Sequence, residues 1–235
     1  MSSNATDSAN LNDLIATLST GNLKKQLQAV SDLSSAAAAQ ALIDFVREGL
    51  SEGAPTAAHG SAYQALVELE TSVAQNFITE DAPYGLIALR SEQDVDYRDL
   101  QKLLIERKYQ AADKLTTEKL CELAGERAVQ RKWVYFTEVG QFAVTDLQTI
   151  DTLWRLYSED KFGWSKQHEL WMRLGQDWER LWAQLIWKSS EGKWTRYPGE
   201  FIWDLSAAPV GHLPLCNQLR GVRMMDALLS HPAWR

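Results

Sequence analysis

Cysteines, long apolar runs and targeting signals are scarce or missing in this sequence of 235 residues. The cysteines, Cys121 and Cys216, are too few for a disulfide framework or a cysteine-rich metal site, so we expect buried free thiols in a reducing compartment. No apolar run reaches the ~18 residues of a membrane span. The first residues lack a basic region, an apolar core and arginine, which argues against a secretory signal and a transit peptide. We therefore expect a cytoplasmic protein.

Positive charge and tryptophan are rare or absent in the first part of the chain. Residues 1–82 hold three Lys or Arg against ten Asp or Glu, whereas residues 83–235 hold 21 of each sign. All ten tryptophans lie at or after Trp133. An acidic first part argues against nucleic-acid binding. The contrast predicts two domains, an N-terminal accessory domain over 1–82 and a core domain over 94–235, with a linker over 83–93.

Helical spacing of apolar residues recurs along the chain and predicts an all-α fold. In the first part it marks short helices around residues 11–18, 23–33, 36–50 and 63–77, which favours a small bundle or a repeat-like stack. In the core, we expect Asp96, Thr145 and Ser165 to cap the starts of three helices, with a capping box over 145–148. The stretch 133–142 is apolar and contains β-branched residues, so a β-strand is a possible structure there. The later tryptophans are interpreted as core packing.

Sequence signatures of catalysis are missing as well. There is no Gly-rich phosphate loop, no Gly-x-Ser-x-Gly elbow, no Cys-x-x-Cys and no His-Glu-x-x-His. The pair Glu118 and Glu122 has the spacing of a solvated helix face. His212 lies in a Gly-His-Leu-Pro stretch without partner ligands, so a hydrogen bond to the loop backbone is favoured over a metal site. We therefore expect a protein that is not an enzyme and holds no metal.

An aromatic, irregular stretch over residues 194–215 stands out against this background. Long loops are normally polar and exposed, yet this one holds Tyr197, Phe201 and Trp203. It leads into an expected helix over 216–230. An apolar loop of this kind, next to fixed positive charge, suggests a binding site for a flat, apolar ligand that carries acidic groups.

The positive charge comes from Arg220 and Arg223, which share one face of that helix at i and i+3. Two guanidinium groups at this spacing suit a ligand with two carboxylates. Each arginine could equally pair with a nearby acid such as Glu200, Asp204 or Asp226. Spacing alone leaves these two alternatives about even.

The motifs of the core resemble those of the genomes-uncoupled-four family. The resemblance covers about residues 94–235 and rests on the stretches Asp96–Gln101, Leu120–Gly125, Trp133–Val139, Trp194–Pro198, Trp203–Ala207 and Gly211–Arg223. Residues 1–82 are similar only as an acidic helical extension of the kind that cyanobacterial members carry.

The resemblance implies an all-helical core with a cupped cavity and long loops that binds protoporphyrin IX and magnesium-protoporphyrin IX. It implies a non-catalytic regulator and carrier without an intrinsic cofactor, which docks on the large porphyrin-binding subunit of magnesium chelatase and stimulates that enzyme in chlorophyll biosynthesis. It is compatible with peripheral contact with thylakoid membranes, and we expect a monomer. The alternative is a helical adaptor whose aromatic loop is a protein-docking site.

Carried over by motif, the resemblance also implies roles for individual residues. Phe136 and Val139 would line the cavity floor. Tyr197, Phe201 and Trp203 would belong to a mobile loop over the macrocycle. Asn217, Arg220 and Arg223 would meet the propionates or the rim of the cavity.

Overall fold

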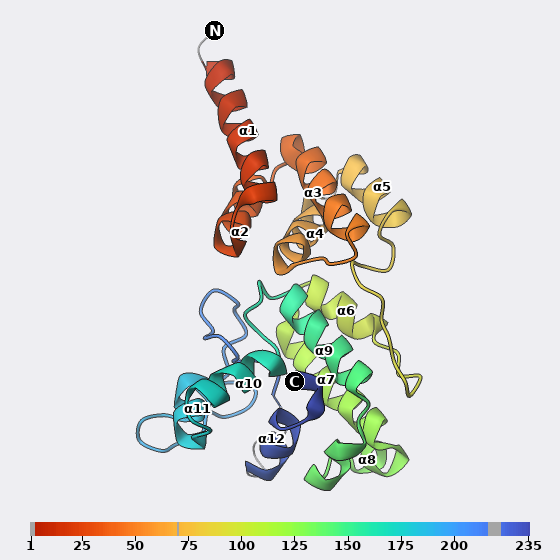
Figure 1. Cartoon of the computed structure of the whole chain (residues 1–235), viewed down its shortest axis with the longest axis vertical. Helices are drawn as coiled ribbons and strands as arrows, with labels where there is room; N and C mark the ends of the chain where they lie inside the picture. Colours follow the sequence, from red (N-terminus) through yellow and green to blue (C-terminus); the bar gives the residue numbers. More distant parts are fainter. Residues whose placement is uncertain (1–2, 70, 216–221) are drawn as a thin grey trace. The chain divides into compact units, whose positions relative to one another are not determined.

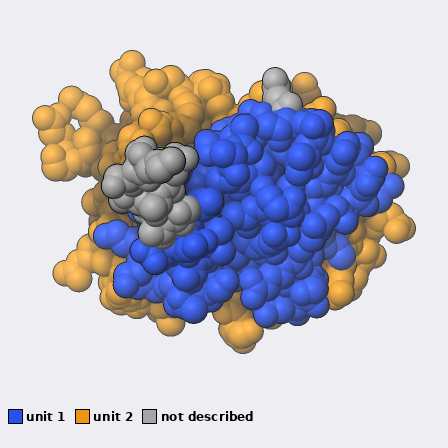
Figure 2. Space-filling model, turned by 90° about the horizontal axis from the view of Figure 1, so that it is seen from above, with its two compact units in different colours: residues 1–88 blue, residues 89–235 orange. Residues whose placement is uncertain are grey.

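Helices form the regular secondary structure in the part of the chain that this computed structural model describes, which is residues 3–69, 71–215 and 222–235, with side chains from Leu11 onward (Figure 1). Among those residues the β pairing is limited to one isolated bridge between Lys188 and Trp194. The predicted all-α fold class is therefore confirmed. The chain divides into two compact units, residues 1–88 and 89–235, which Figure 2 colours separately. None of the described helices is both long and apolar enough to cross a bilayer.

Unit 1 is a stack of short helices. They are α1 (Ser3–Thr20), α2 (Leu23–Asp32), the short 3-10 helix η1 (Ala36–Ala38), α3 (Ala39–Ser51), α4 (Ala57–Leu69) and α5 (Ser72–Glu80). Helix α4 is central, since every residue from 57 to 66 is buried and it packs against α2, α3 and α5. The single helix expected over 63–77 is wrong, because the chain forms α4 and α5 instead. Thr71 caps α5, where its hydroxyl accepts a hydrogen bond from the Ala74 N–H at 3.2 Å.

Helices α3 and α4 approach each other closely at Gly49. A Cβ atom at this position would lie 2.7 Å from the imidazole ring of His59. The ring stacks on Phe45, with centroids 4.1 Å apart, and its Nδ1 accepts a hydrogen bond from the Thr56 N–H at 2.9 Å. Burial lowers the pKa of His59, so the ring is a neutral part of the core.

Unit 2 contains the remaining helices. They are α6 (Arg98–Ile105), α7 (Tyr109–Ala124), α8 (Glu126–Arg131), the 3-10 helix η2 (Phe136–Gln141), α9 (Val144–Leu156), α10 (Trp164–Arg173), α11 (Trp178–Gln184), α12 (Val222–Leu229) and the 3-10 helix η4 (Pro232–Trp234). The predicted packing role of the tryptophans is confirmed for Trp154, Trp171 and Trp182, which are buried, whereas Trp178 is half-buried. Trp164 and Trp187 are fully buried as well. The indole N–H of Trp154 donates to Thr116 Oγ1 at 3.0 Å, and that of Trp187 donates to the His212 carbonyl oxygen at 2.9 Å.

The three predicted helix caps in the core are wrong. Asp96 lies one residue too early, because α6 begins at Arg98 after Tyr97, although its carboxylate accepts the Arg98 N–H at 2.9 Å. Helix α9 begins before the expected capping box, and the Thr145 hydroxyl donates to the Glu92 carboxylate instead. For Thr145 the distant Glu92 carboxylate takes the hydroxyl that the capping box would have used.

Ser165 is the third predicted cap that is wrong, because α10 begins at Trp164 and its N-cap is Gly163. Its N–H and hydroxyl both donate to the carboxylate of Asp151, at 2.8 and 2.6 Å. A strand over 133–142 is also wrong. The segment forms η2, and the Glu138 carboxylate accepts the Tyr135 N–H at 2.8 Å at its start.

A buried carboxylate on α9 holds the first residues of unit 2 in place. Asp146 is fully buried. It accepts hydrogen bonds from the Ser91 hydroxyl at 2.5 Å, the Glu92 N–H at 2.9 Å and the Tyr97 hydroxyl at 2.7 Å. Burial and the carboxylate raise the pKa of Tyr97, so the phenol stays a donor. Asp146 thereby ties the segment that precedes α6 to the core of unit 2.

We predict that Asp146→Ala destabilises unit 2 by about 3 kcal/mol, because three donors lose a charged acceptor in a buried site. Urea unfolding followed by tryptophan emission measures this effect, since all ten tryptophans lie in unit 2. The control is Asp99→Ala, which removes an exposed acid from the first turn of α6 and costs at most about 1 kcal/mol. Equal losses for the two variants would contradict the assigned role of Asp146.

Candidate functional site

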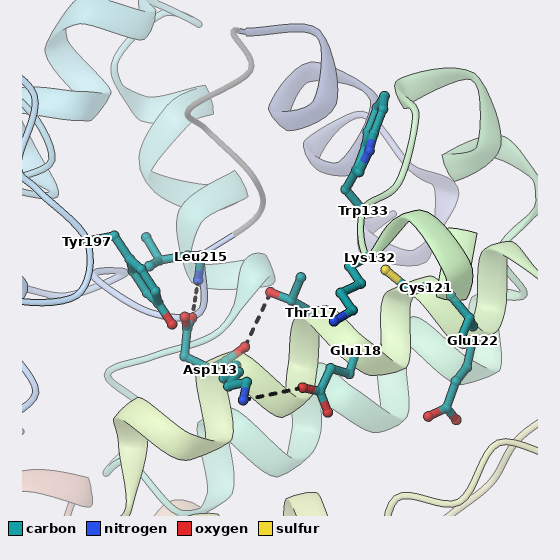
Figure 3. Close-up of a pocket in the computed structure, with 11 residues that line it drawn as sticks. Asp113, Thr117, Glu118, Cys121, Glu122, Lys132, Trp133, Tyr197 and Leu215 are labelled. Atoms are coloured by element: carbon teal, nitrogen blue, oxygen red, sulfur yellow. Dashed lines mark hydrogen bonds and ion pairs between the residues drawn. The ribbon is translucent and has the colours of Figure 1, made fainter. Parts of the chain in front are cut away.

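A hollow of about 580 Å³ lies along one side of α7 in unit 2 (Figure 3). We call it the α7 hollow. It is lined by Asp113, Lys114, Thr117, Glu118, Cys121, Glu122, Val129, Lys132, Trp133, Tyr197 and Leu215. Its volume is within the range of small-molecule sites, roughly 300 to 1,000 Å³.

Helix α7 supplies one wall of this hollow through a stripe of residues at helical spacing. Asp113, Thr117 and Cys121 follow each other at i, i+4 and i+8 and face the hollow. The neighbouring face of the same helix, with Ala112, Leu120 and others, is buried in the core of unit 2. Helix α7 therefore connects the hollow to the core of unit 2, with one face in the core and the other lining the hollow.

The aromatic side chain of Trp133 reaches the hollow from the segment after α8. Lys132 ends α8 in the left-handed conformation, with φ at 61°. Trp133 then packs against Tyr135, with ring centroids 4.1 Å apart. The Arg131 guanidinium carbon lies 5.0 Å from the Trp133 ring centroid and 4.3 Å from that of Tyr135. Arg131 also forms an ion pair with Glu138. These contacts fix the position of the indole before any ligand arrives.

The second aromatic side chain, Tyr197, reaches the hollow from another direction and points its hydroxyl at Asp113 (Figure 3). Asp113 is almost fully buried, and its carboxylate accepts the Leu215 N–H at 2.7 Å. Burial raises the pKa of Asp113 to about 7, and the hydrogen bonds from Leu215 and Tyr197 partly oppose this rise. Asp113 therefore joins the Tyr197 loop and the Leu215 segment to α7.

The segment 211–215 is irregular and buried, so its backbone polar groups need partners inside the protein. The Gln167 side chain on α10 donates to the carbonyl oxygens of Gly211 and Pro214, at 2.9 and 2.8 Å. The Leu213 carbonyl oxygen accepts the Gly163 N–H at 2.9 Å. Together with the Asp113 bond, these contacts fix the wall of the hollow that Leu215 forms.

A glycine is required at the start of this segment. Gly211 has φ at 79°, in the left-handed region, and a Cβ atom there would lie 2.9 Å from methyl carbons of both Leu170 and Leu185. The close approach brings the segment into the core of unit 2.

The charged side chains at the hollow are of both signs. Lys114 lies 3.9 Å from Glu118, an exposed and therefore weak pair. Glu122 pairs with Lys119 at 2.9 Å. Lys132 forms no ion pair with any residue that the structure describes. The lining therefore holds two lysines and three acids, and among the described residues Lys132 is the lysine without an acidic partner that is available to an anionic group.

Cys121 is buried and free, as predicted, while Cys216 lies outside the described residues. Burial raises the pKa of the Cys121 thiol. The thiol is therefore an apolar part of the wall and not an activated nucleophile.

Three of the residues expected at the site form one aromatic cluster. The rings of Tyr197, Phe201 and Trp203 lie with their centroids 5.9 to 6.0 Å apart. Phe201 is buried and also packs on His212, at 5.5 Å. Tyr197 lines the hollow, whereas Phe201 and Trp203, in the same loop, do not. Their contact with a ligand stays a prediction.

A second group of expected residues lies on two elements that pack together, with Phe136 and Val139 in η2 and Arg223 in α12. The Arg223 guanidinium carbon lies 5.3 Å from the centroid of the exposed Phe136 ring. Val139 is fully buried. None of the three lines the α7 hollow. The other two expected residues, Asn217 and Arg220, lie outside the described residues.

His212 bonds the loop backbone, as predicted. Its Nδ1 donates to the Leu185 carbonyl oxygen at 2.6 Å, and its Nε2 accepts the Ile202 N–H at 3.1 Å. Burial lowers the pKa of the ring, consistent with a neutral imidazole. His212 thereby anchors the Tyr197–Trp203 loop. Among the described residues no group of three or more His, Cys, Asp or Glu side chains is placed to hold a metal.

Most residues that line the hollow were not expected from the sequence. Asp113, Lys114, Thr117 and Glu118 have the spacing of a solvated helix face, and spacing cannot tell such a face from a ligand-binding one. The sequence signal at this place is Trp133, an aromatic residue directly after a helix end; its stretch carries part of the family resemblance, but the resemblance assigned no site role to Trp133 itself.

Comparison with known proteins finds two family matches along the chain. The GUN4-like family matches residues 90–232, and a family described as an ARM-like repeat domain, GUN4-N terminal, matches residues 2–83. The two matches lie in unit 2 and unit 1, respectively.

Relatives match over different lengths of the chain. A Ycf53-like protein of Synechocystis sp. is 43% identical, over 97% of each chain. A protein of Arabidopsis thaliana named tetrapyrrole-binding protein, chloroplastic, is 36% identical, over 57% of this chain and 54% of its own length. The structure of GUN4 from Chlamydomonas reinhardtii is 39% identical, with a TM-score of 0.59 over 63% of this chain and 93% of that one. The chain therefore belongs to the GUN4-like family, which its core motifs resemble.

Proposed function

We propose that the chain binds protoporphyrin IX and magnesium-protoporphyrin IX in the α7 hollow, and that it stimulates magnesium chelatase as a regulator and carrier that is not itself a catalyst. The observation that carries this proposal is the placement of Trp133 and Tyr197, with Lys114 and Lys132, around one hollow of about 580 Å³. The name of the Arabidopsis relative supports the choice of a tetrapyrrole as the ligand class.

The physical match is between a flat ligand and a mostly apolar hollow. A porphyrin is a rigid apolar disc with two carboxylate tails, and burying it gains about 25 cal/mol per Å² of apolar area. Trp133 and Tyr197 offer ring faces to the disc, and Val129, Cys121 and Leu215 add apolar surface. Lys114 and Lys132 attract the carboxylates and orient the ligand.

Arg223 is a further cation of unit 2, on Phe136 and outside the lining of the hollow. Among the described residues it forms no ion pair with Glu200, Asp204 or Asp226, which were the structural alternatives for its charge. Glu200 is engaged elsewhere, since it accepts the Arg196 N–H at 2.8 Å. An arginine that rests on an aromatic ring and has no acidic partner is available to a carboxylate. Its role at the rim, with Asn217 and Arg220, remains part of the proposal.

A binding role also fits the state of the titratable groups at the hollow. The raised pKa of Cys121 keeps the thiol protonated, and the Asp113 carboxyl is engaged by Leu215 and Tyr197. A neutral thiol and a carboxyl held by hydrogen bonds suit the wall of a binding site, which supports the carrier role. Delivery to the large porphyrin-binding subunit of magnesium chelatase is the step that the carrier role requires, and that subunit is the proposed partner.

We predict that Trp133→Ala weakens magnesium-protoporphyrin IX binding roughly tenfold, because the loss of a stacking ring costs about 1.4 kcal/mol. Titration of the porphyrin absorbance measures the affinity. Trp178→Ala on α11 removes a tryptophan that does not line the hollow and should leave the affinity unchanged. A chain that produces no shift of the porphyrin absorbance would refute the proposed site, and retained binding to the chelatase subunit would then favour the adaptor alternative.

We predict that porphyrin affinity falls as the pH rises through about 7, the raised pKa of Asp113. Below that pH the carboxyl is protonated and neutral, whereas above it a buried anion repels the carboxylates of the ligand. Over the range from about pH 6 to pH 8.5 the fall should be a few-fold. Asp113→Asn cannot ionise and should give a flatter profile. Identical profiles for the two proteins would contradict this role.

We predict that the purified chain raises the rate of magnesium insertion by magnesium chelatase and inserts no magnesium when it is alone. Trp133→Ala should lower this stimulation in parallel with its porphyrin affinity, since delivery depends on binding. Porphyrin fluorescence follows product formation. Full stimulation by a variant that no longer binds porphyrin would separate the regulator role from the carrier role and contradict the latter.

A further inference from the structure

Unit 1 contains a second hollow, between α1 and α3, with a volume of about 340 Å³. We call it the α1–α3 groove. It is lined by Leu11, Ile15, Leu18, Ser19, Ala37, Ala38, Gln40, Ala41, Asp44, Phe45 and Glu48. Nothing in the proposed porphyrin function uses it.

The groove has an apolar floor because large residues on α1 face small ones on α3. Leu11, Ile15 and Leu18 lie at i, i+4 and i+7 on α1, while α3 and the turn before it contribute alanines such as Ala38 and Ala41. The alanines are too short to cover the facing side chains. Leu11 and Ile15 therefore remain 37% and 38% exposed, respectively.

The rim of the groove on α3 is acidic. Glu48 forms no ion pair with any residue that the structure describes. Asp44 accepts a hydrogen bond from the neutral Gln40 side chain at 2.8 Å. Its ion pair is a long, half-exposed contact to Arg47 at 3.7 Å, because Arg47 pairs with Asp81 at 2.9 Å. An exposed contact of this kind neutralises little of the carboxylate charge.

The whole of unit 1 reinforces this local charge. Residues 1–88 hold three Lys or Arg against ten Asp or Glu, so the unit carries the full net charge of -7. Such a surface repels anionic lipid, nucleic acid and a second copy of itself. Its charge complementarity favours a cationic partner.

We propose that the α1–α3 groove binds a basic amphipathic segment of a partner protein. Apolar side chains of that segment enter the groove over Leu11, Ile15 and Phe45, while its lysines or arginines meet Asp44 and Glu48. This is the helix-in-groove mode, in which apolar anchors give affinity and flanking charges give orientation. The stacked helices of unit 1 suit this role, since helical repeats present extended binding surfaces.

The test uses the full chain and a fluorescein-labelled peptide of about 16 residues, built from leucine, lysine and alanine, with leucines at i, i+4 and i+7 and lysines flanking them. Fluorescence anisotropy gives the affinity. Binding should weaken as the salt concentration rises, and a peptide with alanine in place of the leucines should bind at least tenfold more weakly.

Matched variants separate the groove from general charge attraction. Glu48→Lys and the groove-filling Ala41→Trp should each lower the affinity about tenfold or more, with Ile15→Ser as the second apolar variant if Ala41→Trp does not fold. Glu80→Lys makes the same charge change on an exposed position of α5 outside the groove and should change the affinity less than about twofold. Circular dichroism checks that each variant folds.

Three outcomes would overturn the proposal. They are no binding of the leucine peptide, an equal loss with Glu80→Lys and Glu48→Lys, and dimerisation of the chain that Ile15→Ser abolishes in sedimentation. Porphyrin titration of the same variants should be unchanged, because the groove lies in unit 1. Failure of the groove and failure of the porphyrin proposal are therefore distinguishable.

Discussion

The site in unit 2 depends on one constraint, which is that the irregular segment 211–215 is buried. A buried backbone without helical or strand pairing needs other partners, and unsatisfied groups would cost about 1 to 3 kcal/mol each. Gln167 and Asp113, from two different helices, supply those partners. The position of Leu215 follows, and with it one wall of the hollow. The same segment presents His212, which anchors the aromatic loop through the Ile202 N–H.

This constraint also determines the chemistry of the hollow. A carboxyl that satisfies a buried backbone donor must itself be buried, and burial raises its pKa to about 7. Asp113 is therefore at the edge of ionisation in a site that, on the proposed function, receives two carboxylates. On the proposed function, Asp113 therefore has two roles: it satisfies a buried backbone donor, and its charge affects ligand binding. The Tyr197 hydroxyl interacts with the same carboxyl, so Asp113 also connects the aromatic loop to α7.

The sequence predicted the helical fold and the packing role of the tryptophans, because apolar spacing and aromatic size determine both. It placed helix starts wrongly where a distant group competes with the local cap, as Asp151 does for Ser165. It also missed most of the hollow. Lys114 and Glu118 look like a solvated face from spacing alone, and only the approach of Trp133, Tyr197 and Leu215, up to about a hundred residues away along the chain, converts that face into a wall.

The division of charge between the units suggests why one chain contains both. Unit 2 is neutral as a whole, so the lysines at its hollow can attract an anionic ligand without a general field that would hold it after delivery. Unit 1 contains the whole acidic excess, which disfavours an anionic ligand and favours cationic protein surfaces. On the two proposals, the porphyrin binds to unit 2 and the basic partner to unit 1. Charge then separates the two classes of partner, and this separation requires no particular arrangement of the two units.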